Sequence, residues 1–360
     1  MTTTATPEPR WYPDIALTPA AAEAGHPGLH RATAAAWQHV TTEHITAHRH
    51  LHVPAPGRAP ELVSFFLTTR SPYWNAWEST TGTGPVWNGP VVYAPSLYSG
   101  HGGAGLGSPQ TAALTIANGI EQARRWGACA LVMPHLTAAH TAIARQAAEP
   151  DADLFANLGY TAAVRPRGLE EHLAALPNRK AARGFARAHR RATEAGLRLR
   201  VLRGDDLAGA LPAFTALARD VDAKHSAAKV GADTIAATAA APGSLLLAAE
   251  HDGTLVGGFL SVEYGGCLYL STAGIDYTRL RQLHTYEWLM GTAIQYAADR
   301  QLHTIDAGRS NHLVKVRWGF AAHELRTLVY LTAADPGLAG ALRRLGDGLR
   351  AHARDSGAPL

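Results

Sequence analysis

The sequence predicts an α/β protein with two mixed-sheet domains joined by a strongly basic helix. Three observations support this prediction: the length of the chain, an order of elements that is repeated along it, and a cluster of arginines near its middle. A chain of 360 residues is long for one hydrophobic core, because domains mostly contain about 100–200 residues. The composition, 46% hydrophobic and 17% charged, is that of a folded globular protein rather than a disordered one.

The first half contains the elements of one such domain. Residues 1–30 are rich in Pro, Thr and Ala and are interpreted as a loosely ordered leader. Beyond it, β-branched and aromatic runs predict strands, and apolar residues at helical spacing predict helices. The expected strands are 61–70, 89–100, 128–136 and 160–168, and the expected helices are 110–127 and a segment around 141–159.

The second half repeats this order of strand, loop, helix and strand. Strands are expected at 197–204, within 244–275 with a hairpin turn at 251–254, and at 327–331. Helices are expected from 177, at 283–301 and, as a closing amphipathic helix, at 337–355. The predicted division is a leader 1–30, an N-terminal domain 31–176, a basic linker helix 177–196, a C-terminal domain 197–333 and a C-terminal helix 334–360.

Several classes of protein are excluded by composition and spacing. Cys129 and Cys267 are far apart and form no metal-binding or redox spacing, which favours a reducing compartment. The N-terminus lacks a basic start followed by an apolar core, so no signal peptide is predicted. No apolar run approaches the roughly 18 residues of a membrane-spanning helix. We therefore expect a cytoplasmic protein without a membrane partner, and a monomer is favoured.

A basic stripe lies on the helix expected from residue 177. Its cations recur mostly at four-residue steps, with Phe185 and Ala192 on the opposite, buried side. The basic stripe consists of Arg179, Lys180, Arg183, Arg187, Arg190 and Arg191. Guanidinium groups match phosphates, so the stripe indicates a nucleic-acid partner. The alternative is an ordinary solvated helix face in an arginine-rich composition.

A second cluster lies in the segment DAGRSNHLVKVRWGF, residues 306–320, which is expected to be a strand-end loop. Its acid, cations and hydrogen-bond donors are Asp306, Arg309, His312, Lys315 and Arg317. Such groups in one loop can act together on a single reacting centre. The alternative is that Asp306 and Arg309 pair only to fix the loop.

The basic helix and the segment from Leu283 to Phe320 resemble the FemAB-like, peptidoglycan-biosynthesis branch of the GNAT acyltransferase superfamily. The resemblance extends over roughly 60–330, and its specific motifs lie within 177–320. It implies a duplicated GNAT fold. It also implies transfer of an aminoacyl group from aminoacyl-tRNA to an amine, with formation of an amide, whereas some members of the family use acyl-CoA.

The resemblance also implies roles for individual residues. Lys315 matches a lysine that Fem-type proteins carry before their closing Gly-Phe-like segment, so it is expected to stabilise the oxyanion or to hold the terminal phosphate of the tRNA. His284 is the candidate base or proton relay for the amine. Asp306 would orient a cation or bind the amine of the acceptor. The other candidate catalytic residues are Arg309, His312 and Tyr286.

The loop before each predicted helix bears on the choice between tRNA and CoA as donor. GNAT domains hold the pyrophosphate of CoA on backbone N–H groups of a glycine-containing loop. The second half has no glycine between Gly274 and Gly291, which counts against CoA there, and Arg279 and Arg281 would meet phosphate or ribose as side chains. The glycine loop 99–110 of the first half is a donor-binding loop, a flexible connection or a cover over the acceptor.

An aromatic cluster in residues 71–90 is the candidate acceptor site. It is expected either to form hydrophobic core or to face the space between the two halves, where a small acceptor would bind. The candidate residues are Trp74, Trp77 and Trp87, followed by Tyr93, Tyr98 and His101.

Histidines cluster between His39 and His52, where His44 and His48 have the i, i+4 spacing of two zinc ligands on a helix. Neither a cysteine nor the glutamate of an H-E-x-x-H motif accompanies them. A polar helix end that runs into a strand is the better interpretation, and neither a metal nor another cofactor is expected.

The sequence thus predicts an amide-forming aminoacyltransferase with aminoacyl-tRNA as co-substrate. Its acceptor is expected to be the amine of a small molecule in a natural-product pathway, such as antibiotic biosynthesis. The transferred amino acid is expected to be small, for example glycine. The alternatives are an acyl-CoA N-acyltransferase that uses the first-half glycine loop, and an RNA-binding relative that has lost its catalytic activity.

Overall fold

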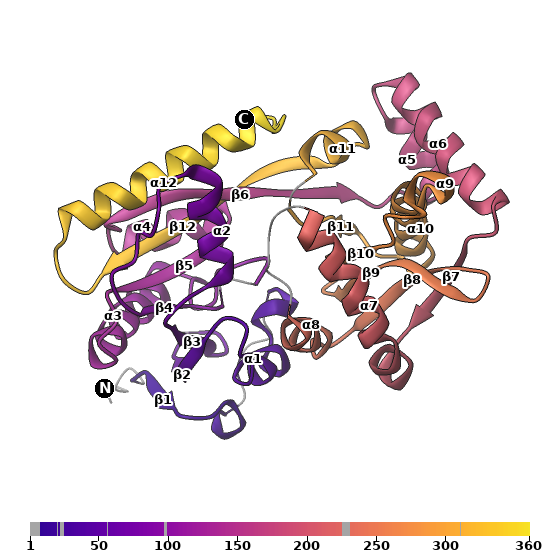
Figure 1. The fold of residues 1–360 in the computed structure, drawn as a ribbon. Coiled ribbons are helices and arrows are strands. Elements are labelled where there is room, and N and C mark those ends of the chain that lie inside the picture. The colour runs from indigo at the N-terminus through magenta and orange to yellow at the C-terminus, as the bar shows by residue number, and fades with distance from the viewer. Residues whose placement is uncertain are drawn as a thin grey trace. The chain divides into compact units, whose positions relative to one another are not determined.

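The computed structural model describes residues 8–19, 21, 25–55, 57–96, 99–224, 231–309 and 311–360. The chain divides into two compact units, each of which is a mixed sheet with helices on it (Figure 1). Unit 1 consists of Met1–Asn157 and Glu324–Ala353, and unit 2 consists of Leu158–His323 and Arg354–Leu360.

Among the described residues, unit 1 contains seven strands, the last two of which extend into unit 2. They are β1 (Arg10–Tyr12), β2 (Ile45–Val53), β3 (Glu61–Thr68), β4 (Val91–Tyr93), β5 (Ala130–Leu136), β12 (Ala321–Leu331) and β6 (Ala152–Ala163), and they pair in the order β1-β2-β3-β4-β5-β12-β6. Its α-helices are α1 (Arg31–Trp37), α2 (Pro72–Thr81), α3 (Pro109–Arg125), α4 (Ala138–Ala147) and α12 (Pro336–Asp355).

Unit 2 contains the end of β6 and five further strands. These are β7 (Arg198–Leu202), β8 (Ser244–His251), β9 (Thr254–Tyr264), β10 (Cys267–Ile275) and β11 (Thr304–Asp306), in the order β6-β11-β10-β9-β8-β7. Its helices are α5 (Leu169–Ala175), α6 (Arg179–Glu194), α7 (Gly204–Lys224), α8 (Ala232–Ala239), α9 (Leu280–Leu283), α10 (Thr285–Asp299) and α11 (His312–Arg317).

The two units pair their strands in the same pattern. In unit 1, β2, β3 and β4 are successive antiparallel neighbours, and β4 crosses through α3 to its parallel neighbour β5. In unit 2, β8, β9 and β10 are antiparallel, and β10 crosses through α10 to the parallel β11. An antiparallel strand follows in each, β12 beside β5 and β6 beside β11. The predicted α/β class with a repeated mixed-sheet domain is therefore confirmed.

Helix–sheet packing explains why the predicted helices form where they do. Helix α3 begins at Pro109 behind the N-cap Ser108 and buries Ile116 and Ala123 against the unit 1 sheet. Gly119 on that face allows close approach, because a Cβ there would lie 2.7 Å from the Phe65 ring. Among the described residues, no helix is both long and apolar enough to cross a membrane.

Two predicted elements differ from the structure. Residues 152–159 were expected in a helix but form the first part of β6, since α4 stops at Ala147 and Pro150 follows it. Leu154, Phe155 and Leu158 are all buried. A strand that is buried on both faces does not alternate apolar and polar residues, so its sequence pattern cannot be distinguished from that of a buried helix.

The second difference concerns the expected strand 89–100. Only Val91–Tyr93 is a strand, because Pro95 follows directly and lacks the N–H that a ladder needs. Residues 97–98 of this segment lie outside the described residues.

Candidate active site

Residues 306–320 form a strand end, a tight turn and a short helix rather than one loop. Strand β11 ends at Asp306, whose Oδ1 accepts a hydrogen bond of 2.7 Å from the N–H of Gly308. Gly308 has a φ of 68°, in the left-handed region that favours glycine. Helix α11 then runs to Arg317, and the Phe320 N–H donates to the Lys315 carbonyl at 3.0 Å. The turn and the helix bring Lys315 back within electrostatic reach of Asp306.

Lys315 is the most unusual side chain of this segment, because only 3% of it is exposed. Its Nζ donates a hydrogen bond of 2.7 Å to the Arg309 carbonyl and lies 5.4 Å from the centre of the Tyr160 ring. Burial lowers the pKa of Lys315 to about 7, Asp306 opposes this shift and Arg309 adds to it. The amine therefore exchanges its proton near neutral pH, which an ordinary lysine does not.

Tyr160 and His312 form a hydrogen-bonded pair beside this lysine. The Tyr160 hydroxyl lies 2.8 Å from His312 Nδ1. Burial raises the pKa of Tyr160 to about 12, so the phenol stays protonated at neutral pH. Tyr160 reaches the site because β6 pairs with β11, and the Ala307 N–H donates to the Tyr160 carbonyl at 2.8 Å.

Sequence reasoning missed Tyr160. It lies about 150 residues before the other members of the site, as one aromatic residue in a strand-like run. Only the pairing of β6 with β11, which joins distant parts of the sequence, gives it a place there.

Tyr286 joins the start of α10 to α11. Its phenol has a pKa raised to about 12 by burial, which a hydrogen bond from the Asn311 side chain opposes. Its ring also lies 5.7 Å from that of Trp318. His284 occupies the N-cap of α10 in a left-handed conformation, with a φ of 48°, and its side chain does not cap the helix. Contacts thus join Tyr286 to the segment 306–320, whereas His284 stands at the helix start.

The basic stripe lies on α6, as expected, and all six of its side chains are exposed. Two of them have partners within the unit: Arg190 pairs with Glu194 at 3.5 Å, and Arg179 donates to the Ala174 carbonyl at 3.0 Å. The other four are Lys180, Arg183, Arg187 and Arg191, and none of them pairs with an acid among the described residues.

Helix α6 packs against the C-terminal end of α11. The buried Phe185 ring of α6 stacks on Trp318, which follows α11, with ring centres 4.5 Å apart and planes 17° apart. Arg317 lies beside Gly184, 4.0 Å from the position of a Cβ on that glycine. The exposed cations of α6 and the buried Lys315 therefore belong to one packed assembly of unit 2.

The starts of α3 in unit 1 and α10 in unit 2 are the two candidate donor-binding sites, and they differ in how they are capped. In unit 1, Ser108 and Thr111 form a capping box at the start of α3, and Pro109 has no N–H to offer an anion. The glycine loop before it packs into its own unit, since the Gly105 carbonyl accepts a hydrogen bond from Thr115 and a Cβ on Gly105 would lie 2.3 Å from the Thr115 hydroxyl oxygen. This packing gives Gly105 a structural role within unit 1.

In unit 2, the start of α10 has no side-chain cap. The Thr285 hydroxyl there is buried without a hydrogen bond to any described residue. Arg279 pairs with Asp276 at 3.7 Å, and Arg281 is exposed.

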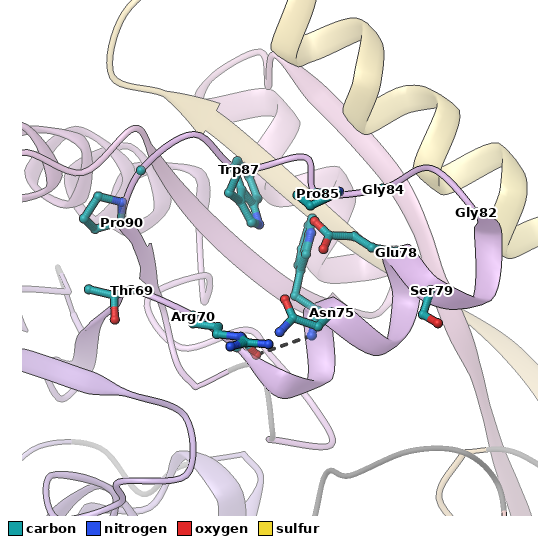
Figure 2. Close-up of a pocket in the computed structure, with 13 residues that line it drawn as sticks. Thr69, Arg70, Asn75, Glu78, Ser79, Gly82, Gly84, Pro85, Trp87 and Pro90 are labelled. Carbon is teal, nitrogen blue, oxygen red and sulfur yellow. Dashed lines mark hydrogen bonds between the residues drawn. The ribbon is translucent and has the colours of Figure 1, made fainter.

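The aromatic segment 71–90 lines a pocket of about 840 Å³ that lies entirely within unit 1 (Figure 2). Of the predicted acceptor residues, Trp74 and Trp87 line it. Trp77 is buried in core contacts with Tyr73 and Trp74, and Tyr93 is 1% exposed on β4.

The two remaining predicted acceptor residues lie elsewhere or are not described. The ring of His101 packs against that of His26, with centres 4.4 Å apart. Tyr98 lies outside the described residues.

The histidine cluster near residue 44 is not on a helix. Helix α1 ends at Trp37, just before His39, and residues 45–53 form strand β2, so the predicted helix end that runs into a strand is confirmed. His44 and His48 therefore do not share a helical face. Alternation along the strand sends His50 inward, where burial lowers its pKa to about 4 and its Nδ1 lies 2.8 Å from the Ser64 hydroxyl. In the described part of the chain, no three His, Cys, Asp or Glu side chains are grouped closely enough to hold a metal ion.

Comparisons with known proteins agree with this architecture. Residues 179–316 match the family described as an acetyltransferase (GNAT) domain. This stretch begins with the basic helix and ends within α11, so it includes both the basic stripe and Lys315. No curated protein matches the sequence.

Several solved structures share the fold at low sequence identity. FemX is 12% identical with a TM-score of 0.54, over 79% of this chain and 88% of that one. L-PGS from Bacillus licheniformis is 12% identical with a TM-score of 0.52, over 83% and 89%. The C-terminal domain of a lysylphosphatidylglycerol synthetase of Agrobacterium fabrum is 11% identical with a TM-score of 0.50, over 79% and 85%. The chain thus has a GNAT fold, and its residues 179–316 match the acetyltransferase (GNAT) domain family.

Proposed function

We propose that the protein is an aminoacyltransferase that moves an amino acid from aminoacyl-tRNA to the amine of a small molecule, with formation of an amide. One observation carries the proposal: a buried lysine with a pKa near neutrality lies on a short helix that packs against an exposed basic helix. The first feature suits proton transfer at an ester, and the second suits the phosphates of a large polyanionic co-substrate.

The chemistry needs a group that accepts a proton from the attacking amine and returns one to the leaving ribose. The amine nitrogen attacks the ester carbonyl carbon, and the new C–N bond leaves a negatively charged oxygen. Lys315 Nζ takes the proton from that nitrogen and, once charged, stabilises the oxyanion. When the bond from the carbonyl carbon to the ribose oxygen breaks, Nζ passes the proton to that oxygen.

The residues around Lys315 support this cycle. The carboxylate of Asp306 favours the protonated amine, while burial and Arg309 favour the neutral one, and the balance places the pKa near the working pH. The protonated phenol of Tyr160, paired with His312, lies beside Nζ as a second donor for the oxyanion. His284 stays a proposed relay for the acceptor amine, with Tyr286 positioning the helix start on which it lies.

The basic stripe is proposed to hold the tRNA. Four exposed cations without acid partners along one helix give sequence-independent affinity for a phosphate backbone. Arg317 and Arg281 are further exposed cations of the same unit. The proposed acceptor is a small amine rather than a lipid-linked precursor, and the proposed amino acid is small, such as glycine.

The acyl-CoA alternative has one observation in its favour. The start of α10 is uncapped and has an unpartnered buried hydroxyl at Thr285, where a GNAT domain would bring a pyrophosphate. Against it, Leu280 and Leu283 of α9 lie on the approach to that helix start, and no glycine opens it.

One experiment separates the two donors. The purified protein is incubated with a charged-tRNA pool and a panel of amines, with and without ribonuclease, and in parallel with acetyl-CoA. We expect an amide product that ribonuclease abolishes and that CoA thioesters do not replace. An amide formed from acetyl-CoA and insensitive to ribonuclease would establish the alternative instead.

A further inference from the structure

The unit 1 pocket is formed by α2 and the segment that leads from it to β4. Its volume of about 840 Å³ is within the range of sites for small ligands. Figure 2 shows Asn75 and Glu78 projecting from α2, with Trp87 and Arg70 on other sides of the space. Trp74, which is 1% exposed, closes the interior.

Glu78 is a buried carboxylate without a cation. Only 8% of the residue is exposed, and its Oε1 accepts a hydrogen bond of 2.7 Å from the Val86 N–H. It forms no ion pair with any described lysine, arginine or histidine. Burial raises its pKa, and the Val86 N–H and the nearby Trp74 indole oppose that rise. A cation in the pocket would compensate the buried charge.

Two indoles wall the space next to this carboxylate. The rings of Trp74 and Trp87 lie 4.8 Å apart, with planes inclined by 45°. Both indole N–H groups are buried, and neither completes a hydrogen bond to a described residue. The faces of indole rings attract organic cations, and their area covers an aliphatic chain.

Arg70 supplies the opposite charge at the side of the pocket. It is exposed and pairs with no acid among the described residues. Asn75, one turn before Glu78 on α2, adds an amide that both donates and accepts. Among the described residues, the pocket therefore presents one carboxylate and one guanidinium without ion-pair partners, together with an aromatic wall.

We propose that this pocket binds a small zwitterionic amino compound, with its ammonium group on Glu78 beside the Trp87 indole and its carboxylate on Arg70. The identification of this compound as the acceptor rests on the proposed function, whereas its binding does not. The binding test below uses neither tRNA nor acyl transfer, so each proposal can fail without the other.

The test is isothermal titration calorimetry with three probes of one carbon skeleton: γ-aminobutyrate, butyrate and butylamine. We expect γ-aminobutyrate to bind, butylamine to bind more weakly, and butyrate to lose at least about tenfold in affinity, since charge-assisted hydrogen bonds are the strong ones. Butyrate that binds as well as γ-aminobutyrate would overturn the proposal. So would the absence of binding by all three probes at millimolar concentration.

Variants assign the binding to the pocket. Glu78→Gln keeps an acceptor for the Val86 N–H and should weaken γ-aminobutyrate at least about tenfold, while Arg70→Gln should weaken it less. Glu121→Gln is the matched control, because Glu121 lies on α3 of the same unit and pairs at the surface with Arg125 at 3.1 Å. Equal affinity in Glu78→Gln and Glu121→Gln would remove the pocket from the proposal.

A second variant tests the same pocket in case Glu78→Gln does not fold. Trp87 is only half-buried, and Trp87→Leu should weaken both γ-aminobutyrate and butylamine with little change in the circular dichroism of the protein. Full affinity in a folded Trp87→Leu protein would contradict the placement of the ammonium group beside the Trp87 indole.

Discussion

Units 1 and 2 have the same strand pairing and differ in their connections. Strands β9 and β10 of unit 2 are joined by a tight turn at Gly265 and Gly266, with φ values of 55° and 75°. The corresponding strands β3 and β4 of unit 1 are joined by residues 69–90, which contain α2 and most of the pocket lining. Loops tolerate insertions better than the helices and strands that they join, so two copies of one fold are expected to differ most in their loops.

The second difference lies after the crossover helix. Strand β11 of unit 2 leads to Asp306 and the helix that buries Lys315, whereas β5 of unit 1 leads through the N-cap Thr137 directly into α4. The short helix with a buried lysine thus has no counterpart after β5 among the described residues of unit 1. Under the two proposals above, unit 2 carries the chemistry and unit 1 carries the ligand pocket.

The largest expected effect concerns the basic stripe. The triple variant Arg183→Glu, Arg187→Glu and Arg191→Glu should lower tRNA affinity by about 1000-fold or more, because each lost phosphate contact also loses a counterion release. The wild-type affinity should fall steeply with salt, and the variant should show a smaller salt slope. Filter binding across a salt series measures both.

A matched control places the same charge change in unit 1. The control variant reverses Arg124, Arg125 and Arg344, which are all exposed. It should retain most of the tRNA affinity. Equal losses in the two triple variants would mean that only net charge matters and that the stripe is a solvated helix face.

The next largest effect is expected on catalysis, from substitution of Lys315. Lys315→Ala should lower kcat by about 100-fold or more with little change in tRNA affinity, as loss of one transition-state donor typically does. In the wild type kcat should rise as pH increases through about 7, because the neutral amine is the proton acceptor. This rise should be absent from the variant.

Other outcomes would assign Lys315 differently. A rate that falls as pH increases through the same range would make Lys315 only a cation for the oxyanion. A loss confined to KM and partly restored by Lys315→Arg would place it on a tRNA phosphate. Full activity of Lys315→Ala would remove the active site from residues 306–320.

The sequence predicts the repeat and the charged helix because both depend on local patterns. Helix α3 has the expected apolar spacing, and the arginines of α6 recur at the expected steps. The aromatic segment pointed to a site, but sequence did not separate Trp87, which lines the pocket, from Trp77, which lies in the core. That distinction depends on where α2 ends, at Gly82.

Local sequence patterns do not predict which residues are brought together by the pairing of distant strands. Tyr160 contacts His312 only because β6 pairs with β11. The sequence gives no sign that Glu78 lines a pocket, because its burial depends on the fold of the segment after α2. The low pKa of Lys315 likewise arises from burial, which spacing in sequence does not reveal.

Glycine substitutions test whether the glycine loop of unit 1 is structural. Gly105→Ala should destabilise the protein by about 1–3 kcal/mol, since it combines a φ of 73° with a Cβ only 2.3 Å from the Thr115 hydroxyl oxygen. Gly265→Ala in the hairpin of unit 2 meets no atom within 4 Å and should cost about 1 kcal/mol. Urea unfolding measures both. A Gly105→Ala protein of normal stability that loses CoA binding would restore the loop as a donor site.

The smallest expected effect is the pH dependence of stability caused by Glu78. Because burial raises its pKa in the folded protein, Glu78 contributes stability below its unfolded pKa, and this contribution is lost as pH rises through the higher folded value. The melting temperature of the wild type should therefore fall relative to Glu78→Gln as pH rises above the ordinary pKa of a glutamate. γ-Aminobutyrate should reverse this fall in the wild type alone, since an ammonium group on Glu78 favours the charged carboxylate. A difference that does not change with pH would mean that Glu78 is already compensated, and the pocket would then have no unpaired charge with which to select a zwitterion.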